Sequence, residues 1–121
     1  SRESPHSVDE TVRRLESVLQ SRGITVFARI DHSGEAEKAG LRMRPTRLLI
    51  FGNPKAGTPM MVAAPSAALD LPMKLLVAEG ESGSVTVSYN AADHVRQRHG
   101  LSAEVAKPLS AIEGLVAEAI R

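Results

Sequence analysis

The apolar residues of this chain change their spacing twice, and that change limits the folds open to it. Near the N-terminus Val8, Val12, Leu15 and Leu19 recur at the three- to four-residue period of an amphipathic helix. Extended segments follow, and residues 109–120 return to the helical period. This order favours an α+β fold, with an antiparallel sheet of four to five strands and helices packed on one face.

The strand signal is carried by residues 24–30 ("ITVFARI"), 44–52, 71–79 and 84–90. The first segment alternates apolar and other residues, as a half-buried strand does. The second contains the continuous apolar run from Leu48 to Phe51, which predicts a strand that is buried on both faces or central. Gly80 to Gly83 separates the last two segments, so we expect them to be adjacent antiparallel strands joined by a hairpin loop.

Helix boundaries are marked by capping residues. Ser7 with Glu10 predicts a capping box, and Gly23 is placed to end the first helix. Between the strands we expect a loop with one helical turn at residues 35–39. Residues 55–69 predict at most two short helical pieces, broken before Pro65. Residues 91–100 predict a short helix, followed by a further helical segment and the terminal helix.

Bulk properties exclude several classes of partner. With 121 residues the chain predicts a single domain, residues 1–121. Its net charge is +1, which argues against nucleic acid and membrane surfaces as partners.

Cysteine is absent, which excludes disulfides and thiolate chemistry. No apolar run is long enough to span a membrane, so we expect a soluble protein. The start "SRESPH" fits a mature or trimmed form, which leaves cytoplasm and periplasm open.

The segment from Gly52 to Thr58 resembles a phosphate-binding loop without its lysine. The pattern G-x-x-x-x-G-K-[ST] lacks the Lys before the Thr, and that Lys carries the charge that reaches the terminal phosphates. Pro54 and Pro59 also remove two amides from the loop. We therefore interpret the segment as a turn after a strand, followed by a helix that begins at Pro59 and is capped by Thr58.

A small-molecule site is predicted at the strand ends around His32. Polar side chains from neighbouring loops can converge there with His32 at the rim of the sheet. The candidate ligand-binding residues are His32, Asn53, Lys55, Asp70 and Tyr89. The simpler interpretation is that Asp31 and His32 shape the turn after the strand, since Asp often hydrogen-bonds its own backbone there.

A heme or a metal ion is left open as a cofactor. His32, His94 and His99 are weak candidates for metal ligands, and Tyr89 or a histidine could hold a noncovalent heme. His94 and His99 are five residues apart, which places them about 140° from each other on a helix, so solvent exposure is the simpler interpretation. The serines lack a nucleophile-elbow context. No catalytic residue is assigned, and whether the chain is an enzyme is left open.

The sheet face away from the helices must be covered by a partner subunit or line a cavity. The alternating residues of the strands leave apolar side chains on more than one side. We expect Phe27, Tyr89 and residues 48–51 to form the apolar wall of that face. A homodimer that packs through its sheet or helices is the expected assembly.

Long stretches of the chain resemble one family. The string "RPTRLLIFGNPKAGTPMMVAAPSAALDLPMKLLVAE", with "SVDETVRRLE" and "TVFARIDH" before it, is similar to the domain-of-unknown-function 302 family. The resemblance implies a TATA-box-binding-protein-like fold (strand, helix, four strands, helix), usually dimeric, with a truncated or frayed first strand at residues 1–5.

The family name carries no activity, so the resemblance implies a fold and not a mechanism. We therefore predict a noncatalytic dimeric binding or assembly module. The alternative is a small-molecule, metal or heme-binding protein with its site around His32.

Overall fold

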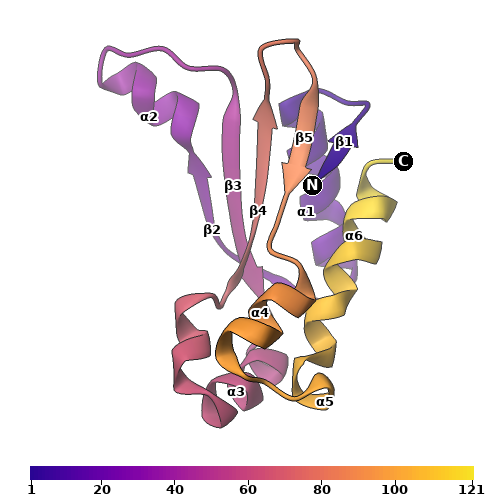
Figure 1. Cartoon of the computed structure of the whole chain (residues 1–121). Helices are drawn as coiled ribbons and strands as arrows, with labels where there is room; N and C mark the ends of the chain where they lie inside the picture. The colour runs from indigo at the N-terminus through magenta and orange to yellow at the C-terminus, as the bar shows by residue number, and fades with distance from the viewer.

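The computed structural model describes every residue from Ser1 to Arg121, and its centre is one antiparallel sheet (Figure 1). The strands are β1 (Arg2–Ser4), β2 (Thr25–Asp31), β3 (Thr46–Gly52), β4 (Met73–Glu79) and β5 (Val85–Ser88). Their order across the sheet is β1-β5-β4-β3-β2, and every neighbouring pair is antiparallel. The predicted α+β class and the order of strand, helix, four strands and helix are confirmed.

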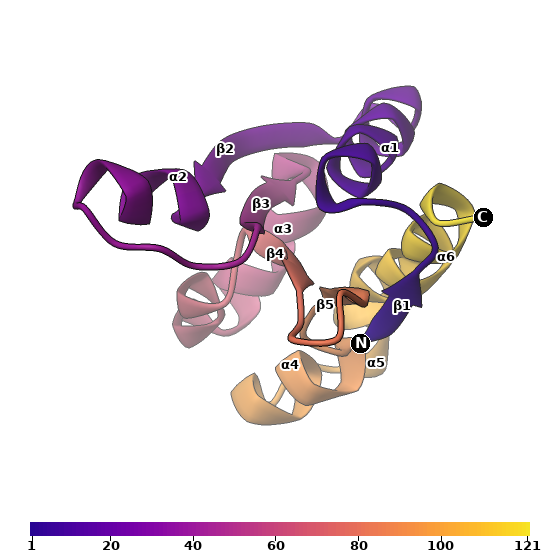
Figure 2. The same ribbon diagram turned by 90° about the horizontal axis from the view of Figure 1, so that it is seen from above.

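The helices divide into two that pack on the sheet and several that gather at one end of it. The helical segments are α1 (Val8–Ser21), α2 (His32–Lys38), α3 (Pro54–Ala63), η1 (Pro65–Leu69), α4 (Ala92–His99), α5 (Ala103–Ala106), η2 (Lys107–Ser110) and α6 (Ala111–Ala119). Helices α1 and α6 lie beside each other on the same side of the sheet (Figure 2). The segments α3, η1, α4 and α5 collect below the lower strand ends in Figure 1.

The core lies between the sheet and the pair α1 and α6, and it is aliphatic. Strand β4 shows how it is built, because alternate side chains point to opposite faces of a strand. Leu75 and Val77 are fully buried against the helices, whereas Lys74 and Leu76 point to the other face. Leu15 and Leu115 complete this layer from α1 and α6.

The opposite face of the sheet carries no covering helix, and its centre is apolar. The register of the strands places three rows of side chains on this face, and we call the surface that they form the open face. The rows are Ala28, Ile50 and Lys74; Ile30, Leu48, Leu76 and Ser88; and Thr46, Ala78, Thr86 and Glu3. None of the apolar members of these rows packs against the core. The run from Leu48 to Phe51 is thus divided, since Leu49 and Phe51 face the core.

Capping residues define the helix starts, and one of them corrects the prediction. The Ser7 side chain accepts a hydrogen bond from the Glu10 amide, as expected. The prediction that Thr58 caps a helix at Pro59 is wrong, because α3 begins at Pro54 and Asn53 is its N-cap. The Asn53 Oδ1 accepts from the Lys55 amide at 3.0 Å, which starts the helix five residues earlier than predicted.

Strand β1 and helix α2, which lie at opposite edges of the sheet, also differ from expectation in extent. Strand β1 is short but fully paired, with Arg2 to Ser4 opposite Val85 to Val87. Helix α2 begins at His32 and is longer than the single predicted turn. Asp31 is its N-cap and accepts from the Gly34 amide at 3.0 Å, which is the turn-shaping role considered for this residue.

Candidate functional site

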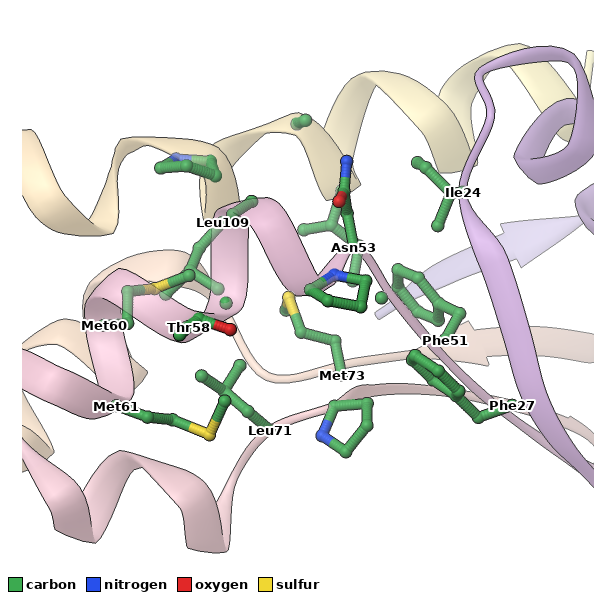
Figure 3. A pocket seen from close by; sticks show the side chains of 18 of the residues that line it. Ile24, Phe27, Phe51, Asn53, Thr58, Met60, Met61, Leu71, Met73 and Leu109 are labelled. Atoms are coloured by element: carbon green, nitrogen blue, oxygen red, sulfur yellow. The ribbon is translucent and has the colours of Figure 1, made fainter.

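An apolar pocket of about 230 Å³ lies below the sheet, between α3 and the start of α6 (Figure 3). Its walls come from the end of β3, the inner side of α3, the residues leading into β4, and the segment formed by η2 and α6. The lining side chains include Phe27, Phe51, Met60, Met61, Leu71, Met73, Leu109 and Ile112. The pocket therefore joins segments that are far apart in the sequence.

The chemistry of this pocket is uniform. Asn53 and Thr58 are the polar side chains in its wall, and no charged residue, histidine or tyrosine lines it. The Asn53 carbonyl oxygen is used by the helix cap, so its amide NH₂ group is the part that can donate to a ligand. Thioethers from Met60, Met61 and Met73 supply soft, adaptable apolar surface.

A bulge in β2 positions the aromatic side of the pocket. The register of β2 against β3 shifts between Val26 and Ala28, which leaves Phe27 as an extra residue. Phe27 is 50% exposed and contributes to the pocket wall. A Cβ at Gly52 would lie 3.4 Å from the Phe27 ring and 3.5 Å from Pro72. Phe27, Pro72 and the end of β3 thus lie in close contact on this side of the pocket.

The predicted convergence of His32 with Asn53 and Lys55 is wrong. In the antiparallel pair of β2 and β3, Asp31 lies opposite Arg47, whereas Thr25 lies opposite Gly52. His32 therefore follows one end of this strand pair, and Asn53 follows the other end. Of the predicted ligand-binding residues, Asn53 alone lines the apolar pocket. Lys55 is exposed on α3.

Asp70 also has a different neighbour from the predicted one. The Asp70 Oδ2 accepts a hydrogen bond from Nε2 of His99 at 2.6 Å. Nη1 of Arg98 lies 3.2 Å from each carboxylate oxygen. The hydrogen bond from His99, with the nearby charge of Arg98, holds the pKa of Asp70 below its usual range, against the opposing effect of burial. Asp70 therefore joins the end of η1 to the last turn of α4.

The remaining candidates do not form a shared cofactor site. Tyr89 is half-buried and packs against the core rather than on the open face, contrary to the prediction. His94 is exposed, whereas the His99 side chain is 4% exposed, so the expected solvent exposure of His99 is wrong. The structure contains no group of three or more His, Asp or Glu side chains arranged to hold a metal ion.

The sequence did not predict two features below the sheet: the apolar pocket and the contacts among Ser66, His99 and Asp70. The pocket is formed by segments far apart in the chain, and no short motif in the sequence brings them together. The contact between Ser66 and His99, whose Oγ and Nδ1 are 2.8 Å apart, joins residues 33 positions apart and has no local signal. Asp70 and His99 are both among the predicted site residues, but no local pattern pairs them with each other or with Ser66.

The fold and the pocket define a small α+β domain with an apolar ligand-sized cavity beside the strand ends. The chain belongs to the family described as domain of unknown function DUF302, which matches residues 1–119. A crystal structure of an uncharacterized conserved DUF302 protein from Bacillus stearothermophilus is similar, with a TM-score of 0.80 over 98% of this chain and 92% of that one. The two sequences are 19% identical, so this likeness establishes the fold alone.

The curated relatives are longer proteins. Over 106 residues the chain is 45% identical to the Fluoride-specific ion channel FluC 1 of Brucella suis, which covers 86% of this chain and 42% of that protein. FluC 1 of Brucella abortus matches at 45% identity over 39% of its length. The chain thus spans about two fifths of the curated relatives it matches. No helix of this chain has the length and apolar character needed to cross a bilayer.

Proposed function

We propose that this chain is a binding module for an uncharged, largely apolar small molecule. The observation that carries the proposal is the pocket of about 230 Å³ whose wall has Asn53 and Thr58 as its polar side chains. Small-molecule sites are typically apolar, with a few polar groups that fix the orientation of the ligand. A charged ligand would lose its hydration here without gaining a partner of opposite charge.

The size and the lining of the pocket narrow the ligand further. A dry apolar cavity of about 150 Å³ is large enough to bind benzene. The pocket of about 230 Å³ therefore suits a molecule somewhat larger than a single ring, such as a fused aromatic system or a short acyl chain. The amide of Asn53 and the hydroxyl of Thr58 suit a ligand with one polar end, such as a carbonyl or hydroxyl group.

Binding of the apolar fluorophore N-phenyl-1-naphthylamine tests this proposal. Gly57 lies in the pocket wall, and a Cβ placed there has no heavy atom within 4 Å, so Gly57→Leu adds a larger apolar side chain at the wall with room for its Cβ. We expect saturable fluorescence enhancement for the wild type and at least about a tenfold weaker Kd for Gly57→Leu, which corresponds to 1.4 kcal/mol. The readout is a fluorescence titration.

Gly114→Leu is the matched control for that experiment. Gly114 also lies in a helix with open space around its Cβ position, but it does not line the pocket. Both substitutions raise helix propensity by a similar amount. The proposal fails if the two variants bind the fluorophore equally, or if the wild type shows no saturable binding.

We further propose that the open face of the sheet packs against a second copy of this chain. Its central side chains, Ile30, Leu48, Ile50 and Leu76, are apolar and only half-buried. A contiguous apolar face of this kind marks an interaction surface. A two-fold dimer uses the same patch on both subunits, which requires a face that is complementary to itself.

The charges on the open face support a self-complementary arrangement. Lys74 lies in the row near the α3 end of the sheet, and Glu3 lies in the row near the opposite end. A two-fold axis that reverses the strand ends moves the lysine end of one subunit toward the glutamate end of the other. The resulting attraction favours pairing of two copies over pairing with an unrelated apolar surface.

Sedimentation velocity at tens of micromolar tests the dimer. We expect the wild type to sediment as a dimer and Leu48→Asp to sediment as a monomer, because the substitution places a carboxylate at the centre of the apolar face. Val62→Asp is the control, since Val62 is a 77% exposed apolar residue on α3, away from the sheet. A monomeric wild type, or a dimer that survives Leu48→Asp, would contradict this proposal.

The curated relatives suggest where such pairing would act. Those proteins are named fluoride-specific ion channels, and the match covers about two fifths of their length. We propose that a domain of this type, when it is joined to a channel, contributes to assembly by pairing with its counterpart. The sedimentation experiment bears on this role, because assembly through the open face requires the isolated chain to self-associate.

A further inference from the structure

Three side chains below the sheet form a continuous hydrogen-bonded chain from a serine to a carboxylate. The Oγ of Ser66 and Nδ1 of His99 are 2.8 Å apart, and Nε2 of the same ring lies 2.6 Å from Oδ2 of Asp70. Short separations at both ring nitrogens fix the imidazole in position between its partners. The arrangement has the connectivity of a nucleophile, a base and a group that orients the base.

The burial of these groups follows the same order. Ser66 is exposed to solvent, the His99 side chain is 4% exposed, and the Asp70 side chain is 11% exposed. A reactive hydroxyl must be reached by its substrate, whereas the base and its orienting carboxylate function best when they are held out of water. An exposed hydroxyl with a buried base and a buried carboxylate behind it is therefore the arrangement that nucleophilic chemistry requires.

Two short helical segments produce this geometry. Ser66 and Asp70 lie at the start and just after the end of η1, and His99 is the last residue of α4, which packs against η1. Gly100 ends α4 in the left-handed conformation, with φ of 64°, and so fixes the position of the last helical turn. Arg98, from that same turn, pairs with Asp70.

We propose that Ser66 is an activated nucleophile that accepts acyl groups from uncharged carboxylic esters. His99 serves as the general base at Nδ1, and Asp70 is the positioning residue that accepts a hydrogen bond from Nε2. Many serine hydrolases use the two ring nitrogens in the opposite sense. Either tautomer of a neutral imidazole has one donor and one acceptor nitrogen, so this arrangement can perform the same proton transfer.

The reaction proceeds in two balanced steps. In the first, the Ser66 oxygen forms a bond to the ester carbonyl carbon while its proton moves to Nδ1 of His99, and the carbon–oxygen bond to the alcohol breaks as His99 returns the proton to the departing alkoxide. In the second, water attacks the acyl-serine with His99 as base. The carboxylic acid leaves, and the Ser66 hydroxyl and the neutral imidazole are regenerated.

The surroundings of Ser66 favour an uncharged substrate with an apolar acyl group. Arg98 is neutralised by Asp70, which leaves no unpaired cation within this cluster to attract a carboxylate or phosphate. Leu69 is 68% exposed, and it follows Ser66 by three residues in a 3₁₀ segment, where side chains three apart lie on the same side. Leu69 therefore provides apolar surface beside the hydroxyl.

Reaction with a biotinylated fluorophosphonate tests the nucleophile, because the Ser66 oxygen would displace fluoride from phosphorus and leave a stable adduct. We expect a single adduct at pH 8, located on Ser66 by peptide mass spectrometry and lost in Ser66→Ala. Asp70→Asn and His99→Gln should react at least tenfold more slowly. Ser110→Ala is the control and should react as the wild type does, since the exposed Ser110 bonds only the Lys107 carbonyl.

The pH profile of the labelling rate separates this role from a structural one. We expect the wild-type labelling rate to rise less than tenfold per pH unit, because a general base on the protein, and not hydroxide, removes the Ser66 proton. This readout holds even if circular dichroism shows that His99→Gln is unfolded. The proposal is overturned if the wild type gives no adduct, if the adduct lies on another serine, or if the rate rises only in proportion to hydroxide.

Discussion

Replacing Leu75 by alanine is expected to lower the free energy of unfolding by about 2–5 kcal/mol. Leu75 is fully buried in the central strand β4, within the layer that α1 and α6 cover, so the substitution leaves a cavity in a core that contains few large side chains. Urea denaturation followed by circular dichroism measures the change.

Leu76→Ala provides a matched control, because Leu76 is the next residue of the same strand and points to the open face. At low protein concentration we expect it to cost much less than Leu75→Ala, since part of its surface is already in contact with water. If the proposed dimer forms, the cost of Leu76→Ala should grow with protein concentration. Equal losses for the two variants at low concentration would contradict the assignment of the core face.

The sequence predicted the fold well because the elements that define it carry local patterns. The helical period of Val8, Val12, Leu15 and Leu19 is the apolar stripe that α1 buries, and the Ser7 cap is present. The continuous run from Leu48 to Phe51 correctly indicated an interior strand of the sheet. Alternation alone did not show which of these residues face the helices and which face the open side.

The candidate site was harder to predict because it depends on which strand ends meet. His32 and Asn53 both follow strands and were expected to converge, yet antiparallel pairing of β2 with β3 sends them to opposite ends. The start of α3 was predicted at Pro59 and lies at Pro54. Pro54 was interpreted as a turn residue, although proline is also favoured in the first turn of a helix.

The contacts of Asp70 illustrate what no local pattern contains. Its partners Arg98 and His99 come from a helix that begins 22 residues later in the chain, and the spacing of histidines within that helix suggested only solvent exposure. The irregular segments between β3 and β4 and after β5 have weak helical periods. Their packing against each other at one end of the sheet creates both the apolar pocket and the Ser66 cluster.

Asp70→Asn is expected to destabilise the protein by about 1–3 kcal/mol at neutral pH, because His99 and Arg98 lose a charged acceptor in a nearly buried position. Asp93→Asn is the control. Asp93 lies in the same region, in α4, but its side chain is 85% exposed, so we expect a change within about 0.5 kcal/mol.

The loss of unfolding free energy in Asp70→Asn should also depend on pH. The depressed pKa of Asp70 determines whether this loss grows or shrinks as the pH falls. A carboxyl group whose pKa is lower in the folded protein than in the unfolded chain contributes stability above its unfolded pKa, near 3.9, and loses it as the pH falls through the folded value. The difference in unfolding free energy between wild type and Asp70→Asn can be measured by urea denaturation at pH 7, 5, 4 and 3. The contribution of Asp70 to this difference should be constant from pH 7 to 5 and should shrink below pH 4. A gap of the same size at pH 7 and pH 3 would show that the Asp70 carboxylate does not have the depressed pKa that its contacts with His99 and Arg98 require.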